Sequence, residues 1–181
     1  VLAFPVGPAL LGLIMAFLLL RYFRVSHPLA VAGAIAFCFS NYYLVIIGAG
    51  HYVKYVNLMM VPGVFLGIVR AYDRQYLTGA VLVGLFMALM FNVQHLQMIY
   101  YMLFVVFFYV VYRAISAAKD KAFKPFAIAS GSLLVAALVG LGSTAIIIMP
   151  LREYTPASFR GPSELSTSTD VLRGDRQQPL K

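Results

Sequence analysis

Apolar residues fall into six long runs that are separated by short polar breaks. A helix of about 20 apolar residues crosses about 30 Å of hydrocarbon, so each run predicts a transmembrane helix. The predicted spans are residues 4–23, 28–47, 55–69, 77–91, 96–115 and 125–149. The third and fourth are the shortest, which favours tilted or partly buried helices. The fold class that follows is all-α: a polytopic transmembrane helical bundle in residues 1–150, with residues 151–181 beginning a loop or domain outside the membrane.

Proline and glycine positions support these boundaries. Pro28 and Pro125 stand where a first helical turn would begin, and a proline is well tolerated there because its missing N–H group needs no partner. Gly48 and Gly50 mark the end of the second span. Pro62 lies inside the third, which predicts a kink or a break in that helix.

Composition places the chain in the same class. Hydrophobic residues make up 62% of it and charged residues 11%, with a mean hydropathy of +0.87, whereas a soluble domain has about 25% charged residues. The single cysteine, Cys38, lies inside an apolar run and has no second cysteine to pair with in this chain. We interpret it as a small buried apolar residue.

The loop charges alternate along the chain. The loops after the first, third and fifth spans carry eight basic residues: Arg21, Arg24, Arg70, Arg74, Arg113, Lys119, Lys121 and Lys124. The other two loops contain only Lys54. The positive-inside rule therefore predicts that the eight basic residues face the cytoplasm, and that Lys54 and the segment after the sixth span face outward. This distribution explains the net charge of +8 without a nucleic-acid partner, because the basic residues are dispersed among short loops.

The first outward-facing segment, GHYVKY, holds His51 and Lys54. Residues three apart share a face of a helix if the third span begins early enough to include them. One interpretation is an interfacial anchor whose lysine amine reaches toward water. The other is an anion site in which both side chains donate to a phosphate.

The second outward-facing segment, NVQHLQ, holds His95 and Gln97 beside further amide side chains. An amide offers a donor and an acceptor together, which suits a hydroxyl-rich ligand such as a sugar. The alternative is a capped helix start followed by interfacial tyrosines.

The third segment, residues 152–165, follows the last span and includes Tyr154, Arg160 and Glu164. Arg160 is suited to a bidentate phosphate contact, and Glu164 to accepting a proton or holding the loop by an ion pair. An ordinary surface loop is the alternative.

Several chemistries have no sequence motif here. The chain contains no phosphate-binding glycine loop, no dinucleotide-binding glycine motif and no zinc-binding spacing of histidine or cysteine, so no metal site is predicted. Asp73 and Asp120 lie among basic residues in the predicted cytoplasmic loops, which counts against a proton relay inside the membrane.

Three motifs in order give the chain a family resemblance. They are GHYVKY, then HLQMIYY, then REYTPASFRGPSEL, and the residues that carry the likeness are Gly50, His51, Lys54, His95, Gln97, Tyr100, Tyr101, Glu153, Tyr154, Arg160, Gly161, Ser163, Glu164 and Leu165. Over residues 36–165 the chain resembles the bacterial YfhO-like membrane proteins, in the form typical of Bacteroidota. It departs from that pattern at Tyr52 and Val53, where small polar residues are common.

The resemblance implies a membrane glycosyltransferase of the GT-C type, multi-pass in the bacterial cytoplasmic membrane. Such an enzyme uses a polyprenyl-phosphate-linked sugar as its donor on the outer face, so the implied partners are the lipid bilayer and that lipid-linked sugar. The carrier phosphate would contact His51, Lys54 and Arg160, and the sugar or the outer loop would be oriented by His95, Gln97, Tyr154 and Glu164.

The resemblance does not identify a catalytic residue or a divalent metal in this chain. The family's catalytic acid lies in an earlier outer loop, which would precede Val1. We therefore expect the chain to be a fragment, with the remainder of the same polypeptide as a further partner. The alternatives are a transporter or flippase subunit for lipid-linked saccharides and a non-catalytic membrane scaffold.

Overall fold

The structure, a computed structural model, describes residues 4–145 and 149–150, and the regular structure over these residues is helical without strands. The helices in chain order are α1 (Val6–Tyr22), α2 (His27–Cys38), α3 (Asn41–Gly48), α4 (Tyr52–Tyr72), α5 (Tyr76–Asn92), α6 (Leu96–Lys119) and α7 (Phe123–Gly142). The prediction of an all-α fold is confirmed.

Four helical segments of the described chain are long and apolar enough to cross a membrane. They are the α2–α3 pair (His27–Gly48), α4, α6 and α7. The other two, α1 and α5, are apolar but have 17 residues each, which at 1.5 Å per residue is about 25 Å. The chain therefore has the helices of a membrane protein.

Two predicted spans differ in detail from the observed helices. The second span is divided, because α2 ends at Cys38 and Ser40 is extended, with φ −60° and ψ 146°, before α3 begins at Asn41. Serine and asparagine compete with helical backbone bonds and favour such a boundary. The third span is longer than predicted, since α4 begins at Tyr52, and Pro62 does not divide it into two helices.

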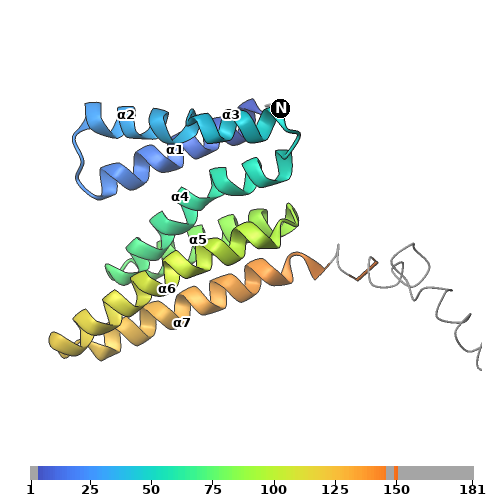
Figure 1. The fold of residues 1–181 in the computed structure, drawn as a ribbon. Helices are drawn as coiled ribbons and strands as arrows, with labels where there is room; N and C mark the ends of the chain where they lie inside the picture. Colours follow the sequence, from blue (N-terminus) through green and yellow to red (C-terminus); the bar gives the residue numbers. More distant parts are fainter. Residues whose placement is uncertain (1–3, 146–148, 151–181) are drawn as a thin grey trace, which may run out of the picture. The chain divides into compact units, whose positions relative to one another are not determined.

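The loops collect at two ends of the helical bundle (Figure 1). At one end the Tyr22 hydroxyl donates to Asp73, and Arg113 pairs with Asp73. At the other end the ring of Phe4 packs on the ring of Tyr52. We call the end with residues 21–26, 70–76 and 113–126 the basic end, and the end with residues 48–54 and 92–97 the histidine end. All eight of the basic loop residues predicted to lie together are at the basic end.

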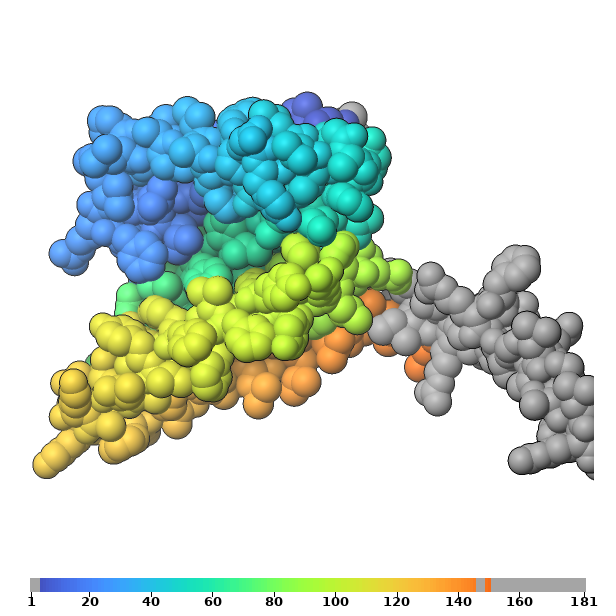
Figure 2. All heavy atoms as spheres, in the orientation of Figure 1, coloured from blue at the N-terminus to red at the C-terminus, as the bar shows by residue number. Residues whose placement is uncertain are grey.

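The central helix is α4, which is packed on two faces. One face contributes Val64 to a cluster with Met87 and Met90 of α5, and the other contributes Met59 to a cluster with Cys38. The helices α6 and α7 instead expose many large apolar side chains to the surroundings. Figure 2 shows α6 at the surface of the bundle. This distribution suits a bundle whose outer surface faces lipid.

Candidate functional site

His51 and Lys54 lie at the start of α4. His51 is the residue that precedes the helix and is exposed, whereas Lys54 is half-buried in the first turn. The amide of Tyr55 donates to the His51 carbonyl at 3.2 Å. The helix thus begins early enough to hold Lys54 in its first turn, directly after His51, and free N–H groups and the helix dipole favour an anion there.

Aromatic rings surround this turn. The ring of Phe4 lies 4.7 Å from that of Tyr52 and 6.0 Å from that of Tyr55, and Tyr55 lies 5.9 Å from Tyr43, as centroid distances. Tyrosine is enriched where a bilayer meets water. The interfacial-anchor and anion-site interpretations of Lys54 both fit this environment.

The NVQHLQ segment connects α5 to α6, and its amides bond locally. The Asn92 amide donates to the Ser143 hydroxyl at 3.2 Å, which ties the end of α5 to the end of α7. The Gln97 amide donates to the Tyr101 hydroxyl at 2.8 Å, one turn along α6. His95 precedes α6, and its Nδ1 atom is buried without a hydrogen-bond partner among the described residues.

The structure places both histidine-bearing segments at one end of the bundle but does not join them. Within residues 4–145, no hydrogen bond or ion pair links His51 or Lys54 to His95 or Gln97. The same residues hold no cluster of three potential metal ligands. The remaining predicted site residues, Tyr154, Arg160 and Glu164, lie outside the described residues.

A polar network at the basic end was not predicted from the sequence. The Asp73 carboxylate accepts from the Tyr22 hydroxyl at 3.0 Å and pairs with Arg113 at 3.1 Å. Arg113 also donates to the Tyr72 carbonyl at 2.6 Å and lies over the Tyr72 ring. Arg70 lies over the Tyr22 ring in the same way. The available signal was Arg113 itself, a charged residue inside an apolar run.

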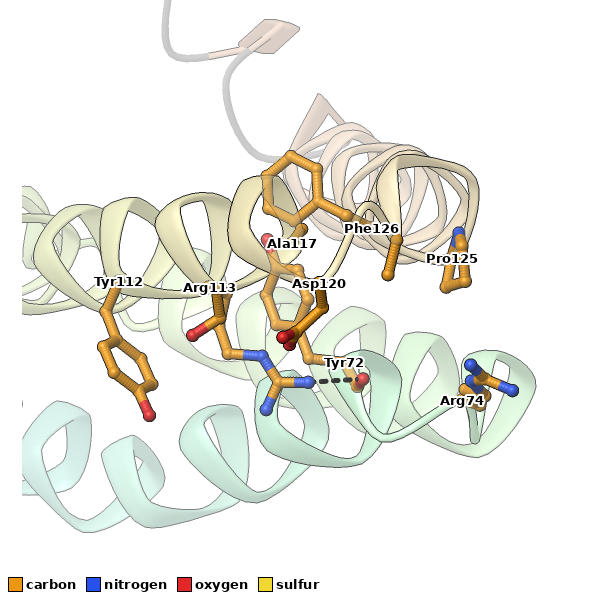
Figure 3. A pocket seen from close by; sticks show the side chains of 10 residues that line it. Tyr72, Arg74, Tyr112, Arg113, Ala117, Asp120, Pro125 and Phe126 are labelled. Atoms are coloured by element: carbon orange, nitrogen blue, oxygen red, sulfur yellow. Dashed lines mark hydrogen bonds between the residues drawn. The ribbon is translucent and has the colours of Figure 1, made fainter.

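A cavity of about 320 Å³ adjoins this network, where α4 and α6 end and α7 begins. Figure 3 shows Arg113 bonded to Tyr72 on one wall, with Arg74 and Asp120 on others. We call this cavity the arginine pocket. Its lining combines guanidinium and aromatic groups, which suits an anionic ligand.

A second cavity, of about 230 Å³, lies between α4, α5, α6 and α7 and is lined almost wholly by apolar side chains. We call it the apolar groove. Tyr72 lines both the groove and the arginine pocket, and its hydroxyl bonds to that of Ser130 at 3.0 Å.

Comparison of the chain with protein-family models, curated proteins and solved structures finds no match. The likeness to YfhO-like proteins therefore remains a prediction from the sequence.

Proposed function

We propose that the chain is the membrane part of a GT-C-like glycosyltransferase that uses a polyprenyl-phosphate-linked sugar. In this proposal the membrane is crossed six times, by α1, by α2 with α3, and by α4, α5, α6 and α7. The basic end faces the cytoplasm and the histidine end faces outward.

The observation that carries the proposal is the separation of charge between the two ends. Eight basic residues gather at the basic end, while the histidine end of the described bundle has Lys54 alone. A lone lysine in an aromatic interfacial turn, at a helix N-terminus and beside His51, suits a phosphate held at the membrane surface. The phosphate of a lipid carrier also lies at the membrane surface.

The roles proposed for the other residues follow from the resemblance to the YfhO-like proteins. Arg160 would share the phosphate with Lys54, and His95 would orient the sugar or the outer loop together with Gln97, Tyr154 and Glu164. The buried Nδ1 atom of His95 has no hydrogen-bond partner among the described residues, and in this proposal such a ligand or loop supplies it.

Replacement of Lys54 tests the proposal. Lys54→Ala in the intact protein should weaken binding of a polyprenyl phosphate roughly tenfold or more, because a hydrogen bond to a charged group contributes about 1.5–3 kcal/mol. Lys119→Ala, at the basic end, is the matched control and should bind normally. Affinity is measured in detergent with a short-chain polyprenyl phosphate.

Two results would count against the proposal. Unchanged affinity of Lys54→Ala would refute the phosphate role. Binding without any sugar transfer by the intact protein would favour the transport alternative over the enzyme.

A further inference from the structure

The arginine pocket carries net positive charge at the basic end. Arg113 on its wall is already paired with Asp73, whereas the Arg74 side chain makes no hydrogen bond or ion pair with another described residue. Asp120 also lines the pocket, and the basic residues Lys119, Lys121 and Lys124 lie close to it in sequence. The lining thus holds two arginines against one aspartate, at an end of the bundle where eight basic residues stand against Asp73 and Asp120.

The start of α7 adds to this preference. Ala122 and Pro125 line the pocket, so the first turn of α7 borders it. The positive end of a helix dipole favours negative charge. Arg74, Arg113 and the start of α7 thus each contribute positive potential to the arginine pocket, whose volume is about 320 Å³.

The apolar groove continues from the arginine pocket along α6. Met102, Val106 and Val110 line the groove, and Arg113 and Ala117 line the pocket. These residues are spaced by three or four, so they occupy one face of α6. From Met102 to Val110 the face is about 12 Å long at 1.5 Å per residue.

The junction of the two cavities is Tyr72, which lines both. Its ring stacks on that of Phe126, with 5.7 Å between centroids, and its hydroxyl is held by Ser130. The arginine pocket and the apolar groove therefore adjoin on the same face of α6, at the end of the bundle where a bilayer meets water. This is the shape of an amphiphile with an anionic head and an apolar chain.

We infer that the arginine pocket and the apolar groove together bind one anionic phospholipid. Its phosphate would lie beside Arg74 and the start of α7, and one acyl chain would lie along Val106 and Val110. The site is at the opposite end of the bundle from Lys54, and it does not depend on glycosyl transfer. Anionic headgroups bind basic pockets between transmembrane helices by the same physical terms.

The chain contains no tryptophan, so one introduced tryptophan gives a fluorescence signal from a single position. Leu103→Trp puts it in the groove, and Val105→Trp puts it on the same helix at an exposed position outside the groove. Each variant is reconstituted into phosphatidylcholine nanodiscs that contain a minor fraction of brominated phosphatidylglycerol or, in parallel, brominated phosphatidylcholine. The Leu103→Trp signal should be quenched more strongly by phosphatidylglycerol, and the Val105→Trp signal equally by both lipids.

A matched pair of arginines tests the headgroup contact. Arg74 and Arg24 are both exposed loop residues of the basic end with positive φ, 67° and 61°, but Arg24 does not line the pocket. In the Leu103→Trp background, Arg74→Gln should lower the preference for phosphatidylglycerol about fivefold, the factor expected from about 1 kcal/mol per basic side chain at a membrane surface. Arg24→Gln should leave it unchanged, and Arg74→Lys should retain most of it.

Three outcomes would overturn the inference. Equal preference at both tryptophan positions would mean general enrichment of anionic lipid around the protein. Equal effects of Arg74→Gln and Arg24→Gln would mean that net charge alone attracts the lipid. Recovery of fluorescence with excess soluble glycerol phosphate would mean that the pocket binds phosphate without a chain. Circular dichroism confirms that each variant is folded before it is compared.

Discussion

The Asp73 carboxylate lies 3.1 Å from the Arg113 guanidinium, although 40 residues separate them in the chain. The second oxygen of the same carboxylate accepts from the Tyr22 hydroxyl at 3.0 Å. One acid therefore connects the ends of α1, α4 and α6. Few other polar contacts link these helices, so the contribution of Asp73 to stability can be measured by replacing it.

Asp73→Asn removes the charge and keeps the shape of the side chain. Unfolding by sodium dodecyl sulfate in mixed micelles should show a loss of up to about 1 kcal/mol, the usual range for a solvent-exposed ion pair. A larger loss is not expected, because the Asp73 side chain is 42% exposed. Asp120→Asn is the control, since Asp120 makes no ion pair with another described residue. Equal losses in the two variants would show that the pair contributes nothing.

Gly67 of α4 and Gly79 of α5 bring the backbones of the two helices close together. A Cβ atom added at Gly79 would lie 2.6 Å from the Gly67 carbonyl oxygen, and one added at Gly67 would lie 2.8 Å from that of Gly79. Such a distance forces the two backbones apart. Gly67→Ala and Gly79→Ala should each destabilise the protein by about 1–3 kcal/mol, as overpacking does.

Gly131→Ala on α7 is the matched control for these glycine variants. A Cβ atom there would meet nothing within 4 Å, and alanine is the better helix former by about 1 kcal/mol. Its stability in the same unfolding assay should be unchanged or slightly higher. Destabilisation by Gly131→Ala equal to that by Gly67→Ala would contradict the close-packing argument.

The helices of the bundle are predictable from the sequence because each depends on a local property, a run of apolar residues. The positions of Gly48 and Pro125 at helix ends follow from backbone chemistry that is also local. The division at Ser40 was missed, since the apolar run continues past it on both sides. Two polar residues, Ser40 and Asn41, are a weak signal when both neighbouring helices remain apolar.

The contacts of the candidate sites are less predictable, because they depend on which distant residues meet. Asp73 looks like an ordinary loop charge, and the residues around Arg113 do not identify its partner. Charge counting placed both at the same end of the bundle, but pairing them requires the packing of α6 against α4. The cavities beside them also depend on how the helices pack, and no spacing of residues in the sequence predicts that packing.

The Tyr72 hydroxyl and the Ser130 hydroxyl form a hydrogen bond of 3.0 Å between α4 and α7. Tyr72→Phe removes this bond and keeps the ring stack on Phe126. The expected loss is about 1 kcal/mol, the net value of one such hydrogen bond. A double-mutant cycle with Ser130→Ala isolates the pair, and Tyr112→Phe, at an exposed tyrosine, is the control. Additive effects of Tyr72→Phe and Ser130→Ala would show that the bond does not stabilise the protein.

The loop charges predict an orientation of the bundle in the membrane, which can be tested with single cysteines. The native Cys38 is 3% exposed, so it should not react with a membrane-impermeant maleimide and need not be replaced. Lys54→Cys should be labelled in intact cells, because the positive-inside rule places the histidine end outside. Lys121→Cys, at the basic end, should be labelled only after the membrane is permeabilised. The reverse pattern would place Lys54 in the cytoplasm, where a sugar donor used on the outer face cannot reach it.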